Sequence, residues 1–325
     1  MTTPVLVLAH DDVVAALPMA DCITAMERTL VGLARGEYFQ PLRTRARPEG
    51  SPNWMTCMPA LRLSGPRLWA LKEMAVTPEN PARGLDPIQG AVLLHDGDDG
   101  RLLAVVDAPT LTSIRTAAVT AVATRRLARA DAKVVAIVGA GVQGRAHVAA
   151  MRCVLPQASI RIWSRTPARA AALARELDCT SVATVEAALA GADVVCTVTA
   201  SAEPVVRCEW FAPGCHVNAV GSSGPATREL DGATLAAAAL FVDRRESAVS
   251  ESGDYLCALK EGAIPGPGHI RAELGEVLAG RHPGRSSAGE LTVFKSLGLA
   301  IEDLVAAETA VARARAIGRG VECPW

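Results

Sequence analysis

The sequence predicts an α/β fold, in which a doubly wound parallel sheet is joined to a mixed α+β domain near the N-terminus. Two observations lead to this prediction. Over residues 116–299, apolar strand-like segments alternate with helical segments, which is the pattern of parallel βαβ units. Before residue 115, strand-like segments instead follow one another through short turns, as in an antiparallel sheet. We therefore expect one domain of residues 1–115 with 300–325, and a second of residues 116–299.

The N-terminal domain is expected to contain one long helix and a series of strands. Apolar residues at helical spacing predict the helix from Met19, and it ends near Gly36. The strand-like segments that follow are PLRTRARP, NWMTCMPAL, LWALKEMAV, IQGAVLLHD and LLAVVDA. The acidic turn DGDDG separates the last two and predicts a hairpin.

The second domain is expected to begin with a long alanine-rich helix from Pro109. The strands expected after it are KVVAIVG, SIRIWS, DVVCTVTA, CHVNAVG and ALFVDR. Helices are expected at VQGRAHVAAMRCV and TPARAAALARELD, and such alternation forms a doubly wound parallel sheet. From about Leu291 we expect one more long helix, which returns to the N-terminal domain.

Composition and charge exclude several classes of protein. Half of the 325 residues are hydrophobic and the formal net charge is -1, which excludes a disordered chain and a basic nucleic-acid binder. No apolar run reaches the roughly 18 residues that a membrane span needs. The nine cysteines are scattered without a C-x-x-C pair, and the six histidines form no metal-binding motif. Because the N-terminus also lacks a basic, apolar leader, we expect a reduced, metal-free protein of the cytoplasm.

Arginine is far more common than lysine in this chain. There are 29 arginines and only four lysines, at positions 72, 133, 260 and 295. Coding bias explains the ratio for the chain as a whole. Each of the few lysines is nevertheless worth following, because a lysine can release its proton and an arginine cannot.

A glycine-rich turn is the first motif that indicates function. The segment KVVAIVGAGVQGRAH places Gly139, Gly141 and Gly144 between an apolar strand and the start of a helix. In this context, G-x-G-x-x-G allows a tight turn, close approach of a pyrophosphate, and close packing of helix on strand. Together with Val142 and Gln143, these glycines predict a Rossmann-type dinucleotide site at the N-terminus of the helix.

The end of the next strand indicates which dinucleotide is bound. A site that prefers NAD usually places a carboxylate there for the ribose 2′-hydroxyl, but this strand ends in Ser164, Arg165 and Thr166, with Arg169 one turn later. A guanidinium can hold a 2′-phosphate instead, so we favour NADP(H) and keep NAD(H) as possible. Thr166 before Pro167 also fits a purely structural helix start.

Later strand ends supply further candidates for the cofactor site. CTVTAS contains Thr197 and Thr199, and NAVGSSGP contains Val220 and Ser222 in a Gly-Ser turn. Ligands bind at the carboxyl ends of strands in such sheets, although each of these residues is also compatible with ordinary loop chemistry.

Taken together, the motifs of this chain resemble those of the ornithine cyclodeaminase/μ-crystallin family of dinucleotide-dependent enzymes. The segments that carry the resemblance are QPLRT, MPAL, LKEM, LTSIRTAAVTAVAT, VGAGVQG, RIWSRT and TVFKSLGLAIED. The resemblance covers nearly the whole chain and implies a homodimer. Its first domain, completed by the C-terminal helix, supplies the dimer contact and the substrate pocket, and a Rossmann domain supplies the cofactor.

The resemblance also implies roles for individual residues. Arg43, Lys72 and Arg115 match positions of the substrate pocket, where they bind the carboxylate of an α-amino or α-imino acid. Ser296 approaches the nicotinamide end of the cofactor, while its neighbour Lys295 is also compatible with a structural position in a helix. Lys72 and Arg115 are the candidates for catalysis. Of the two, only the lysine can lose a proton near neutral pH when it is buried beside other cations.

One turn departs from the cyclodeaminase pattern. The ornithine cyclodeaminases carry an aspartate in the turn after the fifth Rossmann strand, where this chain has Ser223, and Thr227 stands in place of a lysine. A hydroxyl offers no full charge to a substrate ammonium, and the turn looks more like that of the ketimine-reducing μ-crystallin branch. The leading hypothesis is therefore an NAD(P)H-dependent oxidoreductase of a small cyclic imino acid or an L-amino acid. Ornithine cyclodeamination and a non-catalytic protein that binds NADPH and a small ligand remain the alternatives.

Overall fold

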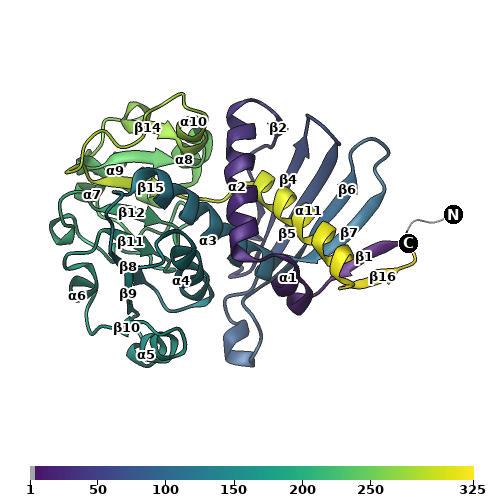
Figure 1. Ribbon diagram of the computed structural model, residues 1–325, viewed down its shortest axis with the longest axis horizontal. Helices are drawn as coiled ribbons and strands as arrows, with labels where there is room; N and C mark the ends of the chain where they lie inside the picture. The colour runs from purple at the N-terminus through teal and green to yellow at the C-terminus, as the bar shows by residue number, and fades with distance from the viewer. Residues whose placement is uncertain (1–3) are drawn as a thin grey trace. The chain divides into compact units, whose positions relative to one another are not determined.

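The computed structural model describes residues 4–325, which divide into two compact units. Unit 1 comprises the chain up to Arg115 together with Leu299–Trp325, and unit 2 comprises Thr116–Gly298. Each unit is built around its own β-sheet (Figure 1). Among the described residues, no helix is long and apolar enough to cross a membrane.

Unit 1 contains an eight-stranded sheet in the order β16-β1-β7-β6-β5-β4-β2, with β3 paired to β4. The strands are β1 (Val5–Leu8), β2 (Tyr38–Phe39), β3 (Thr44–Ala46), β4 (Trp54–Arg62), β5 (Leu68–Val76), β6 (Ile88–Asp96), β7 (Leu102–Asp107) and β16 (Val321–Cys323). The helices are α1 (His10–Ala16), α2 (Met19–Ala34), α11 (Ala300–Ile317) and the short η1 (Asn80–Arg83). Strands β4 to β7 form an antiparallel meander, and β1 runs parallel to β7.

One face of this sheet is packed against helices. In β4 and β5 every second side chain is buried, including Met58, Ala60, Ala70 and Lys72, because these residues point toward α11. Helices α2 and α11 cross in front of the sheet in Figure 1. The structure confirms the predicted α+β domain, its hairpin at the acidic turn and its completion by the C-terminal helix.

Unit 2 contains an eight-stranded parallel sheet in the order β10-β9-β8-β11-β12-β15-β13-β14. The strands are β8 (Val134–Val138), β9 (Ser159–Trp163), β10 (Thr180–Ser181), β11 (Val194–Thr197), β12 (His216–Ala219), β13 (Ala239–Val242), β14 (Ile270–Glu273) and β15 (Thr292–Lys295). The α-helices are α3 (Ala108–Leu127), which contains the boundary between the units, α4 (Val142–Val154), α5 (Pro167–Glu176), α6 (Val185–Leu189), α7 (Gly232–Ala237), α8 (Arg245–Glu251), α9 (Gly253–Lys260) and α10 (Leu274–Leu278). Two short 3₁₀ turns complete the unit, η2 (Cys208–Trp210) and η3 (Pro267–His269).

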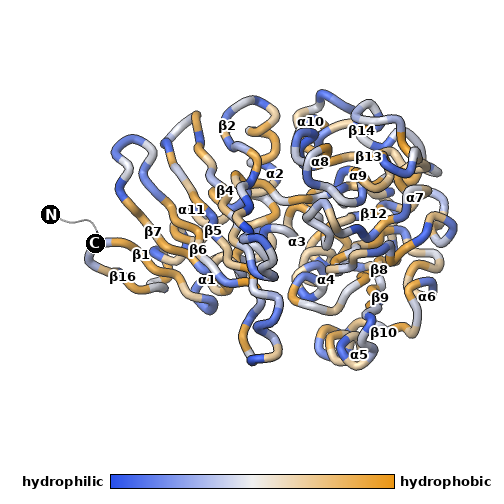
Figure 2. The backbone as a smooth tube through the Cα atoms, turned by 180° about the vertical axis from the view of Figure 1, so that it is seen from behind, coloured by the Kyte–Doolittle hydropathy of each residue, from blue (hydrophilic) through white to orange (hydrophobic). Residues whose placement is uncertain are grey.

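The central strands are almost entirely apolar and buried, as expected for a sheet covered on both faces. Figure 2 shows apolar residues concentrated along the strands, with polar residues at many of the turns. The strand order reverses between β8 and β11, which confirms the predicted doubly wound fold.

The prediction of a single helix from Leu291 is wrong. Residues Thr292–Lys295 form β15, which lies between β12 and β13, and the helix begins only at Ala300. A β-branched and aromatic run, Thr-Val-Phe, favours the strand, and Gly298 separates strand from helix with a φ of +79°.

Candidate functional site

The three glycines after β8 have the distinct steric roles that the motif predicts. A Cβ on Gly139 would lie 2.8 Å from the carbonyl oxygen of Val198, and one on Gly144 would lie 2.2 Å from the carbonyl oxygen of Gly139. A Cβ on Gly141 would instead meet no atom within 4 Å. The turn is therefore tightly packed at its two ends and open in the middle, at the N-terminus of α4. This opening fits a pyrophosphate held by backbone N–H groups, with Val142 and Gln143 as the first helical residues.

The end of β9 presents cations and no carboxylate. Arg165 and Arg169 are exposed, and among the described residues neither guanidinium makes a hydrogen bond or an ion pair. Thr166 is the N-cap residue of α5, but its side chain accepts no capping hydrogen bond. Its backbone N–H is instead 3.3 Å from the Ser164 hydroxyl. Two exposed guanidiniums beside an uncapped helix start can bind an anion.

The remaining candidates for the cofactor site follow three neighbouring strands. Thr197 ends β11, Val220 follows β12 and Ser296 follows β15. Backbone hydrogen bonds align these ends, since Val220 N–H donates to Thr197 O and Ser296 N–H donates to Ala219 O, both at 3.0 Å. The topology therefore brings the candidates to one edge of the sheet, beside the glycine turn.

Sequence reasoning missed the carboxylate that organises this edge. Glu229 is fully buried and accepts hydrogen bonds from the hydroxyls of Thr197 and Thr199, at 2.8 and 2.7 Å. These hydroxyls therefore already have a protein partner. The signal available in the sequence was a single acidic residue in TREL, shortly after the Gly-Ser turn.

The three predicted substrate cations belong to unit 1. Lys72 lies on β5 opposite Met58 of β4, with 1% of its surface exposed. Its Nζ is 2.8 Å from Asp303 Oδ2 at the start of α11. Arg115 of α3 donates from Nε to Asp303 Oδ1 at 2.8 Å and from Nη1 to Glu302 Oε2 at 2.8 Å. Lys72 and Arg115 thus share one carboxylate.

The electrostatic surroundings of Lys72 make its proton labile. Burial lowers the pKa of the Lys72 ammonium from 10.5 to about 8, although the Asp303 carboxylate opposes this shift. The charges of Arg115 and Arg43 contribute to this lowering of the pKa, so Arg43 acts on the same group. Two cations near a third resemble the arrangement expected of a lysine that exchanges a proton near neutral pH.

The charge of the cluster suits an anionic ligand. The cluster contains three cations, Arg43, Lys72 and Arg115, and two carboxylates, Glu302 and Asp303. The Thr56 hydroxyl lies diagonally across from Lys72 on the same face of the sheet, buried and without a hydrogen-bond partner among the described residues. A small monocarboxylate with one polar substituent would complement this set.

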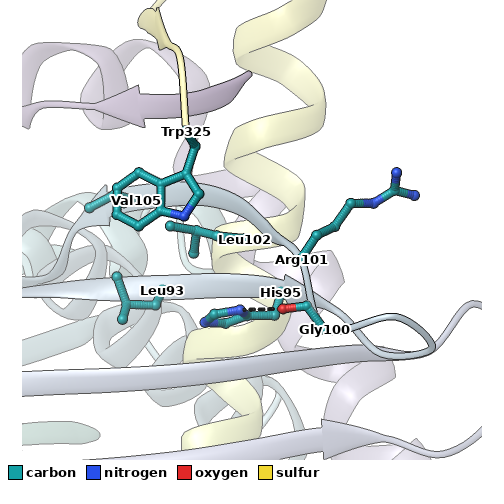
Figure 3. Close-up of a pocket in the computed structure, with 7 residues that line it drawn as sticks. All are labelled: Leu93, His95, Gly100, Arg101, Leu102, Val105 and Trp325. Atoms are coloured by element: carbon teal, nitrogen blue, oxygen red, sulfur yellow. Dashed lines mark hydrogen bonds between the residues drawn. The ribbon is translucent and has the colours of Figure 1, made fainter. Parts of the chain in front are cut away.

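A pocket of unit 1 lies on the opposite face of the sheet from Lys72. Figure 3 shows this pocket, whose volume is about 570 Å³, beside strands β6 and β7. It is lined by Leu93, His95, Gly100, Arg101, Leu102, Val105 and Trp325. Because Val92 is paired with Lys72 and shares its face, the neighbouring Leu93 points away from the cation cluster.

Comparison with known proteins assigns the chain to a family. The model of the ornithine cyclodeaminase/mu-crystallin family matches residues 4–317. The chain belongs to this family. The ketimine reductase mu-crystallin of Mus musculus is 38% identical over 291 residues, which cover 88% of this chain and 90% of the mouse protein.

Solved structures of similar proteins agree with the family. The Δ1-pyrroline-2-carboxylate reductase of Thermococcus litoralis, in complex with NADH and L-proline, has a TM-score of 0.93 and 35% identity, and the match covers 98% of this chain and 100% of the other. An archaeal alanine dehydrogenase dimer with bound NAD has a TM-score of 0.92 and 31% identity, with 99% of each chain covered.

The turn that departs from the cyclodeaminase pattern of the family follows β12. Ser222 is buried, and its hydroxyl contacts the hydroxyl of Thr227 at 2.8 Å. Ser223 is exposed at the surface of unit 2. The turn is therefore closed by Ser222 and Thr227, while Ser223 is presented outward.

No group of three or more potential metal ligands occurs within residues 4–325. All nine cysteines are free thiols, and four of them lie at least partly exposed on helices or loops, such as Cys153 on α4.

Proposed function

We propose that this protein is an NAD(P)H-dependent reductase that adds hydride to the carbon next to the carboxylate of a small α-imino acid. In the reverse direction, it would oxidise the corresponding L-amino acid. The observation that carries the proposal is the pair of cations Lys72 and Arg115, buried beside Glu302 and Asp303, with the charge of Arg43 also acting on Lys72. The ketimine and pyrroline-2-carboxylate reductases among the relatives support the same class of substrate.

The arginines bind and orient the substrate in this proposal. A guanidinium offers a planar pair of donors that matches a carboxylate, and Arg115 is itself held rigid by Asp303 and Glu302. Fixing the carboxylate also fixes the adjacent carbon, which is the atom that receives the hydride.

Lys72 manages the proton. When bound, the reduced nicotinamide supplies the hydride, and the electron pair of the C=N bond moves to nitrogen. A proton must reach that nitrogen to give the amine, and Lys72, or a water that it orients, delivers it. With a pKa of about 8, this ammonium is charged at neutral pH and still acidic enough to transfer its proton.

The decisive experiment follows oxidation of NADPH and NADH with pyrroline-2-carboxylate, with piperideine-2-carboxylate, and with pyruvate plus ammonia. Turnover with at least one of them is expected. A folded protein that binds the cofactor but turns over none of the three would contradict the proposal. Such a result would instead support a protein that binds NADPH and a small ligand without catalysis.

Cyclodeamination is tested by the same preparation. Ammonia and proline formed from ornithine with catalytic NAD⁺ would identify a lyase. We expect none, because Ser223 carries no charge that could hold the side-chain ammonium of ornithine.

NADP(H) is the cofactor that we propose, with NAD(H) as the alternative. The support is the pair of exposed, unpartnered guanidiniums of Arg165 and Arg169, although relatives have been solved with NADH and NAD. Arg165→Ala should weaken NADPH binding by roughly 1–3 kcal/mol for a lost charged hydrogen bond, and leave NADH binding almost unchanged. Equal losses for both dinucleotides would contradict the 2′-phosphate assignment.

We also propose a homodimer that works in the cytoplasm. The face of the unit 1 sheet opposite α11 exposes apolar side chains, such as Met55 at 44% and Trp69 at 39%, and a similar alanine dehydrogenase is a dimer. Trp69→Glu should therefore convert a dimer to a monomer in sedimentation or light-scattering measurements. A wild-type monomer would refute the assembly.

A further inference from the structure

Glu229 is a buried carboxylate that the proposed chemistry does not use. Its two oxygens reach two different strand ends. Oε1 accepts from the backbone N–H of Thr199 at 2.6 Å, and Oε2 accepts from the backbone N–H of Gly221 at 2.8 Å. The hydroxyls of Thr199 and Thr197 donate to the same two oxygens.

The carboxylate is itself anchored by a second buried ion pair. Asp254 Oδ1 accepts from the backbone N–H of Glu229 at 2.7 Å and from that of Leu230 at 2.9 Å. The other oxygen of Asp254 lies 2.8 Å from Lys295 Nζ, which also donates to the carbonyl of Ser222 at 2.5 Å. Through these contacts the ends of β11, β12 and β15 are linked by side chains as well as by the sheet.

The turn after β12 is shaped around this carboxylate. A Cβ on Gly221 would lie 2.0 Å from the carbonyl oxygen of Thr199 and 2.6 Å from Glu229 Oε1. Only glycine therefore allows the two turns to approach each other this closely. The backbone pairing of β11 with β12 does not by itself require the turns that follow these strands to approach each other so closely.

We propose that Glu229 is a positioning residue for the nicotinamide half of the dinucleotide. It clamps the Thr197–Thr199 turn to Gly221 and thereby fixes the surface at the ends of β11 and β12. The inference rests on the proposed function, since it requires a dinucleotide whose pyrophosphate lies at Gly141. The adenine half would lie on the other side of that pyrophosphate, toward Arg165, and would make no contact with the Thr197–Thr199 turn that Glu229 holds.

The anion is the form of Glu229 that fits this arrangement. Burial and the nearby Asp254 charge raise the pKa of the Glu229 carboxyl, while Lys295 and the hydrogen bonds from Thr199 favour the charged form. Both oxygens face a backbone N–H, which can only donate. An amide in place of the carboxylate can therefore satisfy only one of the two N–H groups, whichever way it is turned.

Glu229→Gln provides the test, with affinity as the readout. We expect the Kd of NADPH to rise roughly tenfold, as for loss of one hydrogen bond to a charged acceptor. The Kd of 2′,5′-ADP, which lacks the nicotinamide half, should change by less than about twofold. The emission of bound NADPH should also shift, because the reduced ring reports its own surroundings.

Asp193→Asn is the matched control. Asp193 accepts from the backbone N–H groups of Lys133 and Val134, at 2.8 and 3.0 Å, at the opposite edge of the same sheet. This variant should lose stability and keep both affinities. If Glu229→Gln does not fold, Thr199→Val removes one donor with little change in shape and should raise the Kd of NADPH about threefold, again without effect on 2′,5′-ADP.

The outcomes separate the inference from the function on which it rests. Equal loss of NADPH and 2′,5′-ADP would show general damage to unit 2 and overturn the inference, as would unchanged NADPH binding in a folded Glu229→Gln. If the wild-type protein binds neither NADPH nor NADH, the proposed function itself is overturned.

Discussion

Lys72 in unit 1 and Lys295 in unit 2 are both buried, and each lies 2.8 Å from an aspartate. The additional charges near the two lysines nevertheless differ in sign. Lys72 has two further cations nearby, Arg115 and Arg43, whereas Lys295 adjoins two carboxylates and a carbonyl oxygen. The same kind of ion pair thus serves two purposes. Like charges around Lys72 loosen its proton, whereas the contacts of Lys295 with Asp254 and the Ser222 carbonyl hold its side chain in place.

The largest difference between the two lysines should be in catalysis. Lys72→Met removes the proposed proton donor and should lower kcat by about 10²–10⁴, with the Kd of NADPH unchanged. Lys133→Met, at an exposed lysine, is the control and should leave both constants as they are. A loss in kcat of less than about tenfold would remove Lys72 from the proton transfer.

For stability, in contrast, substitution of Lys295 should have a larger effect than substitution of Lys72. Lys295→Met leaves Asp254 buried without a cation and should lower the free energy of unfolding by about 3 kcal/mol. Lys72→Met should cost less, because Asp303 keeps its bond to Arg115. Denaturant unfolding of the two variants measures both values, and a larger loss for Lys72→Met would break the comparison.

The depressed pKa of Lys72 should also appear in the pH dependence of stability. Between pH 8 and 10.5 the unfolded chain holds a proton on this lysine that the folded chain has released, so stability rises with pH in this window. The contribution is about 3 kcal/mol over the whole window. Other groups titrate in the same range, so the rise is measured as the difference between wild type and Lys72→Met. Parallel curves for the two proteins would show that the pKa of Lys72 is not depressed.

The smallest effect concerns the carboxylate that Lys72 shares with Arg115. Asp303 raises the pKa of Lys72, so Asp303→Asn should lower it further. The alkaline limb of the pH–rate profile for imine reduction should then move to lower pH by about one pH unit. If the alkaline limb of the profile does not move, it reports the titration of a group other than Lys72.

Much of the fold and part of the site could be predicted from the sequence. The glycine turn and the alternation of strands and helices are local patterns, and both are found in the structure. The motifs single out the candidate cations Lys72 and Arg115, but not the carboxylates that pair with them. Asp303 lies 231 positions after Lys72, and only the packing of α11 on the sheet brings the two together.

The error at β15 has a similar origin. Its four residues continue directly into a long helical pattern, and a strand this short acquires its identity from pairing with β12 and β13. Glu229 was missed because nothing in its local sequence shows that it will be surrounded by donors from two other turns.

The position of β15 and α11 in the chain has a consequence for synthesis. β15 fills the middle of the unit 2 sheet, and α11 packs on the unit 1 sheet and carries Asp303, yet both come from residues after 291. While the ribosome is still making these residues, one sheet has a gap between β12 and β13 and the other has an uncovered apolar face. Neither unit can complete its core until the residues of β15 and α11 emerge, so folding during translation cannot proceed one unit at a time from the N-terminus.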